Sequence, residues 1–266
     1  MDLMAGHDRN HFAVSFFSCI FSCAVLLFSL VFSSVGHAGQ WRVAPVRITL
    51  DQRAASCVIT VLNDGEDTVN LQGKAMVWTQ DADGKDVYEE TGDLIFFPRI
   101  LMLHKGEQKI IRAGIKAPAR SREKTYRLFL EEIPQAKADT SDATQLTVVI
   151  RFGIPVFVKP LKEEPAGELV SATLEKGELS AVVANTGNTH FRITDITVKG
   201  TDQAGRETFS EKLNGWYLLA GARRQYSLAV PAEKCLASEQ LDISVVTDSD
   251  ITINRSMDVD KAQCQP

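Results

Sequence analysis

The sequence predicts an all-β protein made of two tandem immunoglobulin-like β-sandwich domains. From residue 41 onward, short runs of alternating apolar and polar residues follow one another, which is the pattern of half-buried strands. Turn-forming residues separate these runs, for example at 63–65 (Asn-Asp-Gly) and at 83–84 (Asp-Gly). Because the first runs include no convincing amphipathic helix, their spacing favours a sandwich of immunoglobulin type.

A charged, turn-rich segment at 162–167 (KEEPAG) divides the runs into two series and is typical of a linker. We therefore expect the first sandwich at 39–161 and the second at 162–266. The strands expected in the first are 41–50, 55–62, 68–78, 94–103, 107–116, 125–132 and 145–158, and those in the second are 168–175, 178–184, 190–199, 206–213, 223–230, 240–247 and 250–257.

Residues 1–38 differ in composition from the rest of the chain. No charged residue occurs at 12–34, and small residues lead up to Ala38, as at the cleavage site of a secretory signal. We predict that residues 1–38 are a signal peptide that is cleaved after Ala38. The apolar run is also long enough to cross a bilayer, so an uncleaved membrane anchor is the alternative.

Three cysteines remain after the predicted cleavage: Cys57, Cys235 and Cys264. In an oxidising compartment, this number suggests one disulfide and one unpaired thiol. Cys235 and Cys264 both lie near the C-terminus and flank short predicted strands, so we expect them to pair. Cys57 lies within an apolar run, and we expect a thiol in the core.

No motif in the mature chain predicts chemistry. A serine hydrolase needs a histidine beside an activated serine, and only His104 and His190 are present, each next to a turn, with no G-x-S-x-G motif. The turn at 81–84 departs from a calcium-binding loop, and no zinc-ligand spacing or phosphate-binding loop occurs. The net charge of −5 does not suggest nucleic-acid binding. We predict no enzymatic activity, catalytic residue, metal, cofactor or small-molecule substrate.

The run at 145–158 is the most unusual of the predicted strands. Pro155 has no backbone N–H, so a central and fully paired strand is not expected at this position. An apolar strand with a free edge can pair with another chain. The alternative is an ordinary core strand of the sandwich. The apolar face at period two consists of Leu146, Val148, Ile150, Phe152, Ile154 and Val156.

Several segments together resemble the periplasmic pilus-assembly chaperones, the PapD-like superfamily. Residues 121–134 (SREKTYRLFLEEIP) are similar to that family's R-E-S-L-F-W-x-N-x-R-E-I-P segment, and 156–160 (VFVKP) to the end of its last first-domain strand. Arg47, Asn63 and the Phe97-Pro98 pair fall where the family has its first-strand arginine, its strand-end asparagine and its F-P element. The resemblance implies two immunoglobulin-like domains in an L-shaped arrangement, with a cleft between them.

This resemblance also implies a function. Such a chaperone works in the periplasm, binds pilin subunits and delivers them to an outer-membrane usher without a nucleotide. Each pilin lacks its last strand, and the chaperone supplies one of its own, which is donor-strand complementation. The side chains that the resemblance places in the subunit groove are Val148, Ile150, Phe152 and Ile154.

One position departs from the common pattern of the family. The family binds the subunit's C-terminal carboxylate with an arginine on the first strand and a lysine on the last, and Pro155 stands where this lysine belongs. The ending at 154–158 (IPVFV), with 126–128 (YRL) and 106–112 (GEQKIIR), is more similar to the branch called archaic or alternative. Because a guanidinium can hold a carboxylate with two parallel hydrogen bonds, we expect Arg127 to be the anchor, with Arg47 the second choice. A charge at the rim of the strand is the alternative role for either arginine.

Two other functions are compatible with the sequence. A secreted adhesive or structural pair of immunoglobulin-like sandwiches would share the fold without chaperone activity. A hydrolase on a β scaffold is disfavoured by the small number of histidines. Copurification separates the first alternative from a chaperone, since only a chaperone should bring a smaller secreted subunit with it.

Overall fold

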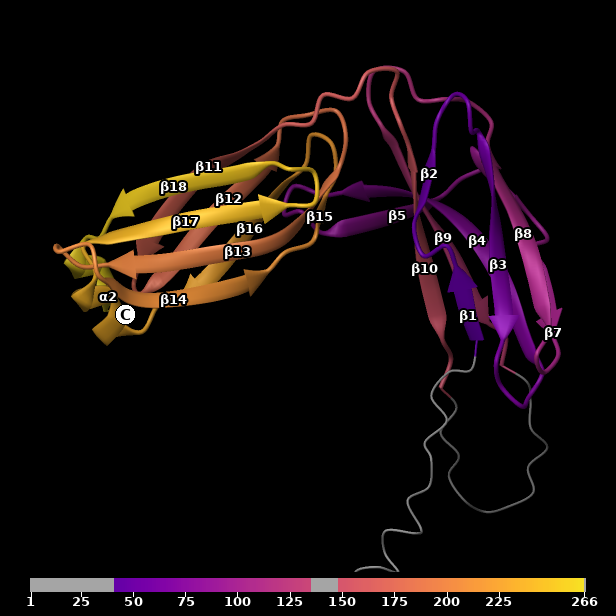
Figure 1. Cartoon of the computed structure of the whole chain (residues 1–266), viewed down its shortest axis with the longest axis horizontal. Helices are drawn as coiled ribbons and strands as arrows, with labels where there is room; N and C mark the ends of the chain where they lie inside the picture. The colour runs from indigo at the N-terminus through magenta and orange to yellow at the C-terminus, as the bar shows by residue number, and fades with distance from the viewer. Residues whose placement is uncertain (1–40, 135–147, 266) are drawn as a thin grey trace, which may run out of the picture. The chain divides into compact units, whose positions relative to one another are not determined.

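The computed structural model describes residues 41–134 and 148–265, and these form two β-sandwiches (Figure 1). The predicted all-β class is therefore confirmed. Within these two ranges, no helix is long and apolar enough to cross a membrane. The predicted signal peptide at 1–38 lies outside the described residues.

The first sandwich consists of two sheets. One has the strand order β1-β3-β8-β6, and the other has the order β2-β10-β9-β4-β5, with β7 paired to β4 (Figure 1). The strands are β1 (Trp41–Ala44), β2 (Ile48–Leu50), β3 (Ser56–Asn63), β4 (Val69–Gln80), β5 (Asp86–Glu90), β6 (Leu94–Phe97), β7 (Ile100–Leu103), β8 (Gln108–Ile115), β9 (Lys124–Glu132) and β10 (Arg151–Val158).

The alternating pattern places one apolar face of each sheet in the core between them. Leu128 on β9 pairs with Ile154 on β10, and both side chains are fully buried. Ile59 and Ile111 face them from the other sheet and are also fully buried. Each such side chain contributes roughly 1.5–3 kcal/mol through burial, so this core is the main source of stability of the first sandwich.

Two predicted strands are each divided in the structure. The run at 41–50 forms β1 and β2, and the run at 94–103 forms β6 and β7; the breaks fall at Pro45 and Pro98. Proline has no N–H to donate to a ladder, so the chain leaves one sheet there. After Pro45 it changes sheet: β1 pairs with β3, whereas β2 pairs in parallel with β10. The short, acidic β5 is not predicted by the apolar pattern.

The second sandwich has a three-stranded sheet, β11-β12-β16, and a five-stranded sheet, β14-β13-β17-β18 with β15 paired to β13. All seven strands expected here are present within two residues of their expected ends, and only β15 is additional. The strands are β11 (Gly167–Glu175), β12 (Glu178–Asn185), β13 (Phe191–Thr201), β14 (Glu207–Asn214), β15 (Tyr217–Leu218), β16 (Arg223–Ala229), β17 (Gln240–Thr247) and β18 (Thr252–Asp258).

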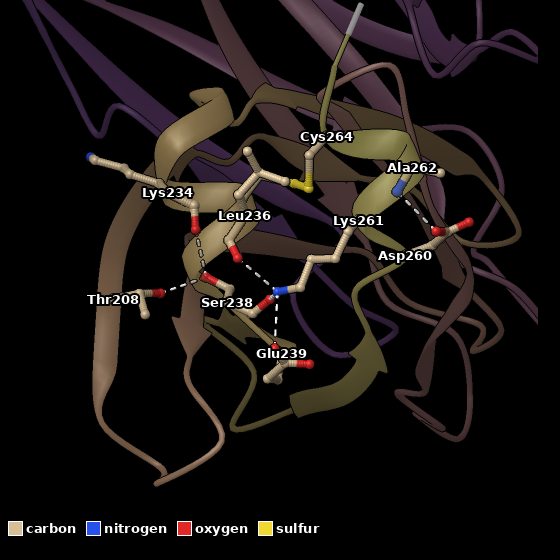
Figure 2. Close-up of a disulfide and its surroundings, with 10 residues drawn as sticks. Thr208, Lys234, Leu236, Ser238, Glu239, Asp260, Lys261, Ala262 and Cys264 are labelled. Carbon is tan, nitrogen blue, oxygen red and sulfur yellow. Dashed lines mark hydrogen bonds and ion pairs between the residues drawn. A yellow bond between two sulfur atoms is a disulfide. The ribbon is translucent and has the colours of Figure 1, made fainter.

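A disulfide joins Cys235 and Cys264, the pair expected from the sequence (Figure 2). The cysteines lie in a short helix, α2 (Ala232–Ala237), and in a 3-10 helix, η1 (Lys261–Cys264), rather than beside strands. Both are buried, and their Cα atoms are 5.5 Å apart. The remaining thiol, Cys57, is half-buried at the margin of the first core, and burial raises its pKa.

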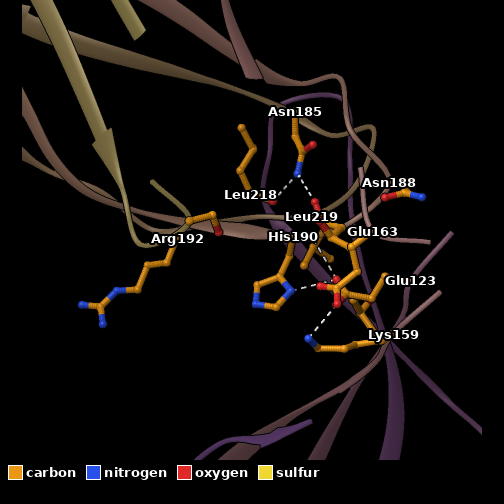
Figure 3. A network of polar contacts seen from close by, with 12 residues as sticks. Glu123, Lys159, Glu163, Asn185, Asn188, His190, Arg192, Leu218 and Leu219 are labelled. Atoms are coloured by element: carbon orange, nitrogen blue, oxygen red, sulfur yellow. Dashed lines mark hydrogen bonds and ion pairs between the residues drawn. The ribbon is translucent and has the colours of Figure 1, made fainter. Parts of the chain in front are cut away.

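A buried asparagine stabilises the same kind of turn in each sandwich. Asn63 ends β3 and Asn185 ends β12, and each accepts a hydrogen bond from the turn that follows. Through its Nδ2 atom, Asn63 donates to the carbonyl of Leu103 at 3.0 Å, and Asn185 donates to that of Leu218 at 2.9 Å (Figure 3). Each amide therefore satisfies buried backbone groups and ties its turn to a distant strand.

Asp93, just before β6, should make the stability of the first sandwich depend on pH. Its Oδ2 atom accepts hydrogen bonds from the hydroxyl of Tyr126 and from Nζ of Lys124, the latter at 2.9 Å. Burial is the largest single influence and opposes ionisation, but the two hydrogen bonds, the charge of Lys124 and a backbone hydrogen bond from Ala117 together outweigh it and lower the pKa of Asp93 below its usual value. Because this pKa is lower in the folded state, the stabilisation is present above about pH 4 and is lost as the pH falls through the lowered value.

The variant Asp93→Asn tests this expectation. At pH 7 it should unfold at a lower urea concentration than the unmodified protein, and the difference should shrink between pH 4 and pH 2. The measurement is the free energy of unfolding in urea at a series of pH values. A difference of the same size at every pH would show that the charge of Asp93 does not stabilise the fold.

Candidate functional site

β10 has a neighbouring strand on both sides, but along one of its edges the first five residues have no strand paired with them in the part of the chain that the structure describes. We call this unpaired stretch the open edge of β10. The whole strand pairs with β9, but β2 covers only the last three residues, Val156–Val158. Within the described residues, no strand pairs with that edge at 151–155. The carbonyl of Ile150 accepts from N–H of Glu132, so by alternation the backbone groups of Arg151, Gly153 and Pro155 point toward the open edge. Pro155 thus lacks its N–H where no neighbouring strand would use it.

The predicted apolar face of β10 changes from exposed to buried along its length. Val148 is 70% exposed, Ile150 and Phe152 are half-buried, and Ile154 is fully buried. The expectation that Ile154 enters a subunit groove is corrected here, because its side chain belongs to the core of its own sandwich. The strand also begins at Arg151 rather than at 145, and Leu146 lies outside the described residues.

Glu132, the last residue of β9, connects the start of β10 to β1. One carboxylate oxygen accepts a hydrogen bond from the indole Nε1 of Trp41, and the other accepts from N–H of Ile150 at 3.4 Å. The Trp41 ring also meets the Phe152 ring edge-on, with centroids 6.4 Å apart. The open edge of β10 and the first strand of the sandwich are therefore held together at this end.

Arg127 lies on β9 opposite Pro155, and its side chain is almost completely buried. The guanidinium carbon is 3.9 Å from the ring centre of Trp78, and Nη1 donates to the carbonyl of Gly153 at 3.1 Å. Nε has no hydrogen-bond partner, and within the described residues no carboxylate forms an ion pair with Arg127. A buried cation without a counter-charge is costly, so this guanidinium is suited to an anion supplied by another molecule.

Arg47 lies in a different environment. It precedes β2, its side chain is 50% exposed, and its Nη1 atom is 3.3 Å from Oδ2 of Asp248. It lines a pocket of about 240 Å³ together with Lys159, and Arg127 is not among the lining residues. The structure therefore does not bring the two predicted arginines into one site, and Arg47 already has an acidic partner.

His190 is a structural residue between the two sandwiches (Figure 3). Its Nδ1 atom and its backbone N–H both lie 2.8 Å from one carboxylate oxygen of Glu123, whose side chain is only 2% exposed. The imidazole stacks on Phe157 with ring centres 3.4 Å apart. Glu123 thus joins the loop before β9 to the second sandwich, a role that its sequence neighbourhood does not indicate.

Comparison with known proteins identifies the first sandwich. Residues 40–163 match the family described as "Pili and flagellar-assembly chaperone, PapD N-terminal domain". The first sandwich belongs to this family. The family is one of chaperones and not of enzymes, and the two-sandwich fold is also found in solved chaperone structures.

The curated relatives of this chain are distant. It is 26% identical over 134 residues to the "Probable fimbrial chaperone EcpE" of Escherichia coli K12, which covers 49% of this chain and 51% of that protein. The chain therefore spans about half the length of the curated relatives that it matches.

Solved structures share the fold over a longer part of the chain. The chaperone CsuC, crystallised with the tip adhesion subunit CsuE of the archaic chaperone-usher Csu pili of Acinetobacter baumannii, has a TM-score of 0.59 at 18% identity, covering 80% of this chain and 97% of that one. The class 5 fimbriae chaperone CfaA has a TM-score of 0.53 at 14% identity, covering 81% and 98%. At these identities the likeness establishes the fold.

The PapD-type sandwich also carries an exposed apolar patch, away from β10. Phe97 on β6 is 77% exposed and, in the register of the sheet, aligns with Arg112 on β8 and Val58 on β3. A hollow of about 380 Å³ on this face is lined by Phe97, Val58 and Arg112, among others. This patch was not predicted from the sequence, although apolar residues at alternate positions of a short strand, facing solvent, are a signal for one. We call it the outer apolar patch, and it consists of Val58, Ile95, Phe97 and Ile110.

Proposed function

We propose that this protein is a periplasmic chaperone of fimbrial assembly, which binds pilin subunits by donor-strand complementation and delivers them to an outer-membrane usher. The observation that carries the proposal is the open edge of β10 beside exposed and half-buried apolar side chains. A partner chain can form main-chain hydrogen bonds with such an edge and bury the adjacent side chains. The two-sandwich fold is also that of CsuC, a chaperone of archaic chaperone-usher pili, and is compatible with this function.

The side chains offered to the subunit are Val148, Ile150 and Phe152. Phe152 packs at the margin of the first core and stays half-buried, whereas Ile154 is excluded because it is fully buried within that core. Three fully exposed groups of this size would contribute roughly 5–9 kcal/mol on burial, before the cost of ordering the two chains is subtracted. The actual gain is smaller because Ile150 and Phe152 are already half-buried, so main-chain hydrogen bonds along the open edge are also needed to hold a subunit.

Arg127 is the proposed anchor for the C-terminal carboxylate of the subunit. Its guanidinium contacts the carbonyl of Gly153, one of the backbone groups directed to the open edge, and it has no acidic partner in the described residues. A strand added along this edge would bring its terminal carboxylate to the same place. Arg47 is the weaker candidate because Asp248 already neutralises it.

The outer apolar patch is the proposed docking surface for the usher. It belongs to the sheet that does not contain β10, so it stays accessible while a subunit occupies the open edge. The usher fits this surface because delivery requires a partner that binds chaperone and subunit at the same time.

The double variant Ile95→Asp with Phe97→Asp should leave the chaperone–subunit complex intact and reduce surface fibre yield about tenfold or more, since two charges would enter an apolar interface. Fibre yield is measured in cells that express the subunit, the usher and the variant. Val170→Asp, at an exposed apolar position of β11, is the matched control. Unchanged fibre yield in the double variant would show that the outer apolar patch does not bind the usher.

The export and domain boundaries are proposed from the sequence. Residues 1–38 would be removed as a signal peptide, leaving sandwiches at 39–161 and 162–266. The mass of the exported protein tests the cleavage: a product that retains residues 1–38 would indicate an anchor instead.

Copurification from the periplasm tests the function as a whole. A chaperone should elute with a smaller secreted subunit in equal amounts, and that subunit should be degraded when the chaperone is absent. A secreted adhesive protein of the same fold would elute without one. A subunit that stays soluble and intact without this protein would contradict the proposal.

A further inference from the structure

We propose that Tyr217, on β15 of the second sandwich, is a positioning residue for Arg127, so that the carboxylate anchor is complete only when both sandwiches contribute to it. This inference rests on the proposed function. It assigns to the second sandwich a part in subunit binding, whereas every other residue proposed to contact the subunit lies in the first.

The evidence begins with the rings around the guanidinium. The Tyr217 ring centre is 5.7 Å from the guanidinium carbon of Arg127 and 5.3 Å from the ring of Trp78, which it meets edge-on at 79°. Trp78 is fully buried, and Arg127 lies 3.9 Å above its face. The tyrosine thus packs on both members of the stacked pair and limits the positions that either can take.

The first sandwich holds this tyrosine in place through its β4–β5 hairpin. Nε2 of Gln80 donates to the carbonyl of Tyr217, and Oε1 of the same amide accepts from N–H of Leu219, both at 2.9 Å. At the start of β5, Oδ2 of Asp86 accepts from the indole Nε1 of Trp216 at 2.9 Å. Three hydrogen bonds therefore fix the segment around Tyr217 against the β4–β5 hairpin, whose first strand carries Trp78.

The chemistry of the contact favours a binding role over simple cross-linking. Aromatic rings stabilise a cation through their quadrupole without neutralising it. An acidic partner would orient Arg127 equally well but would occupy the hydrogen-bonding positions that a carboxylate ligand needs. The guanidinium is oriented by the neighbouring rings, by the carbonyl of Gly153 and by the hydroxyl of Tyr88, and none of these groups is a carboxylate that would neutralise its charge.

A double-mutant cycle tests the inference, with the subunit that copurifies with the protein as the source of the probe. A peptide of its C-terminal strand is made with a free carboxylate and, separately, with a carboxamide. Tyr217→Ala should weaken binding of the carboxylate peptide about tenfold. It should have little effect on the carboxamide peptide, and little effect when Arg127 is already alanine. Tyr217→Phe should restore affinity to within about twofold, because the ring is retained.

Controls separate positioning from general damage. Tyr217→Leu keeps the volume of the side chain without an aromatic face, and it replaces the alanine variant in the cycle if that variant does not fold. Val170→Ala is a distant control in the same sandwich. If Tyr217→Ala weakens binding equally with and without Arg127, the inference fails and the anchor stands. If Arg127→Ala itself has no effect on binding, Arg127 is not the anchor, and the inference fails with it. If no subunit copurifies, the proposed function fails, and so does the inference.

Discussion

Replacing Ile150 and Phe152 together by aspartate should abolish subunit capture. Both side chains lie half-buried beside the open edge of β10, so in a complex each would enter the apolar groove of the subunit. Moving two carboxylates from water into such a groove costs several kcal/mol, and the favourable burial of an isoleucine and a phenylalanine is lost as well. We expect affinity to fall by a factor of at least about 100, since each 1.4 kcal/mol is tenfold. Binding is measured with purified subunit and by subunit recovery from the periplasm.

Two comparisons show whether this effect is local. Val170→Asp with Val246→Asp introduces the same charges at exposed apolar positions of the second sandwich and should leave capture unchanged. Ile154→Asp should instead unfold the first sandwich, because this side chain is fully buried in its core. If subunits remain soluble and polymerise normally with the Ile150 and Phe152 double variant, β10 is not the strand that is supplied.

Arg127→Ala should weaken subunit binding by about 30-fold or more, because removing one partner of a desolvated charge pair costs at least about 2 kcal/mol. Arg127→Lys should recover only part of the loss, because a lysine cannot reproduce the two parallel hydrogen bonds of a guanidinium. Arg47→Ala should have a much smaller effect, since Arg47 is half-exposed and already paired with Asp248. Affinity for the purified subunit is the measurement.

The charge of the ligand provides the control for Arg127. With the unmodified protein, a carboxamide at the C-terminus of the subunit strand should bind more weakly than a carboxylate. With Arg127→Ala the two should bind alike. If Arg47→Ala lowers subunit affinity more than Arg127→Ala does, the carboxylate is bound in the pocket lined by Arg47 and Lys159 and not by Arg127.

Local patterns in the chain were sufficient for much of the fold. Alternation of apolar residues predicted all seven strands expected in the second sandwich, and the asparagine-containing turns at 63–65 and 185–188 predicted where strands end. Pro155 pointed to an incompletely paired strand, and the open edge of β10 agrees with it. These inferences succeeded because strand alternation, turn chemistry and a missing N–H each act on a residue and its immediate neighbours.

Other features depended on contacts between distant segments. Alternation placed Ile154 on the apolar face of β10, but it did not show that the core of the same sandwich reaches that residue. Alternation also predicted β1 and β2 as a single strand. The change of sheet at Pro45 becomes visible only from the pairing, because β1 pairs with β3 and β2 pairs with β10. How far a face is covered is set by the opposite sheet, which a one-dimensional pattern does not contain.

The chain alone thus defined the strands, their turns, the cysteine pair and the unusual character of β10. Folding in three dimensions determined which of the apolar side chains of β10 stay accessible and which arginine lacks a counter-charge. Arg127 and Tyr217 are separated by 90 positions in the chain and meet only because a hairpin of one sandwich holds a short strand of the other. A side chain's environment is the sum of such long-range contacts, and burial and charge pairing follow from it.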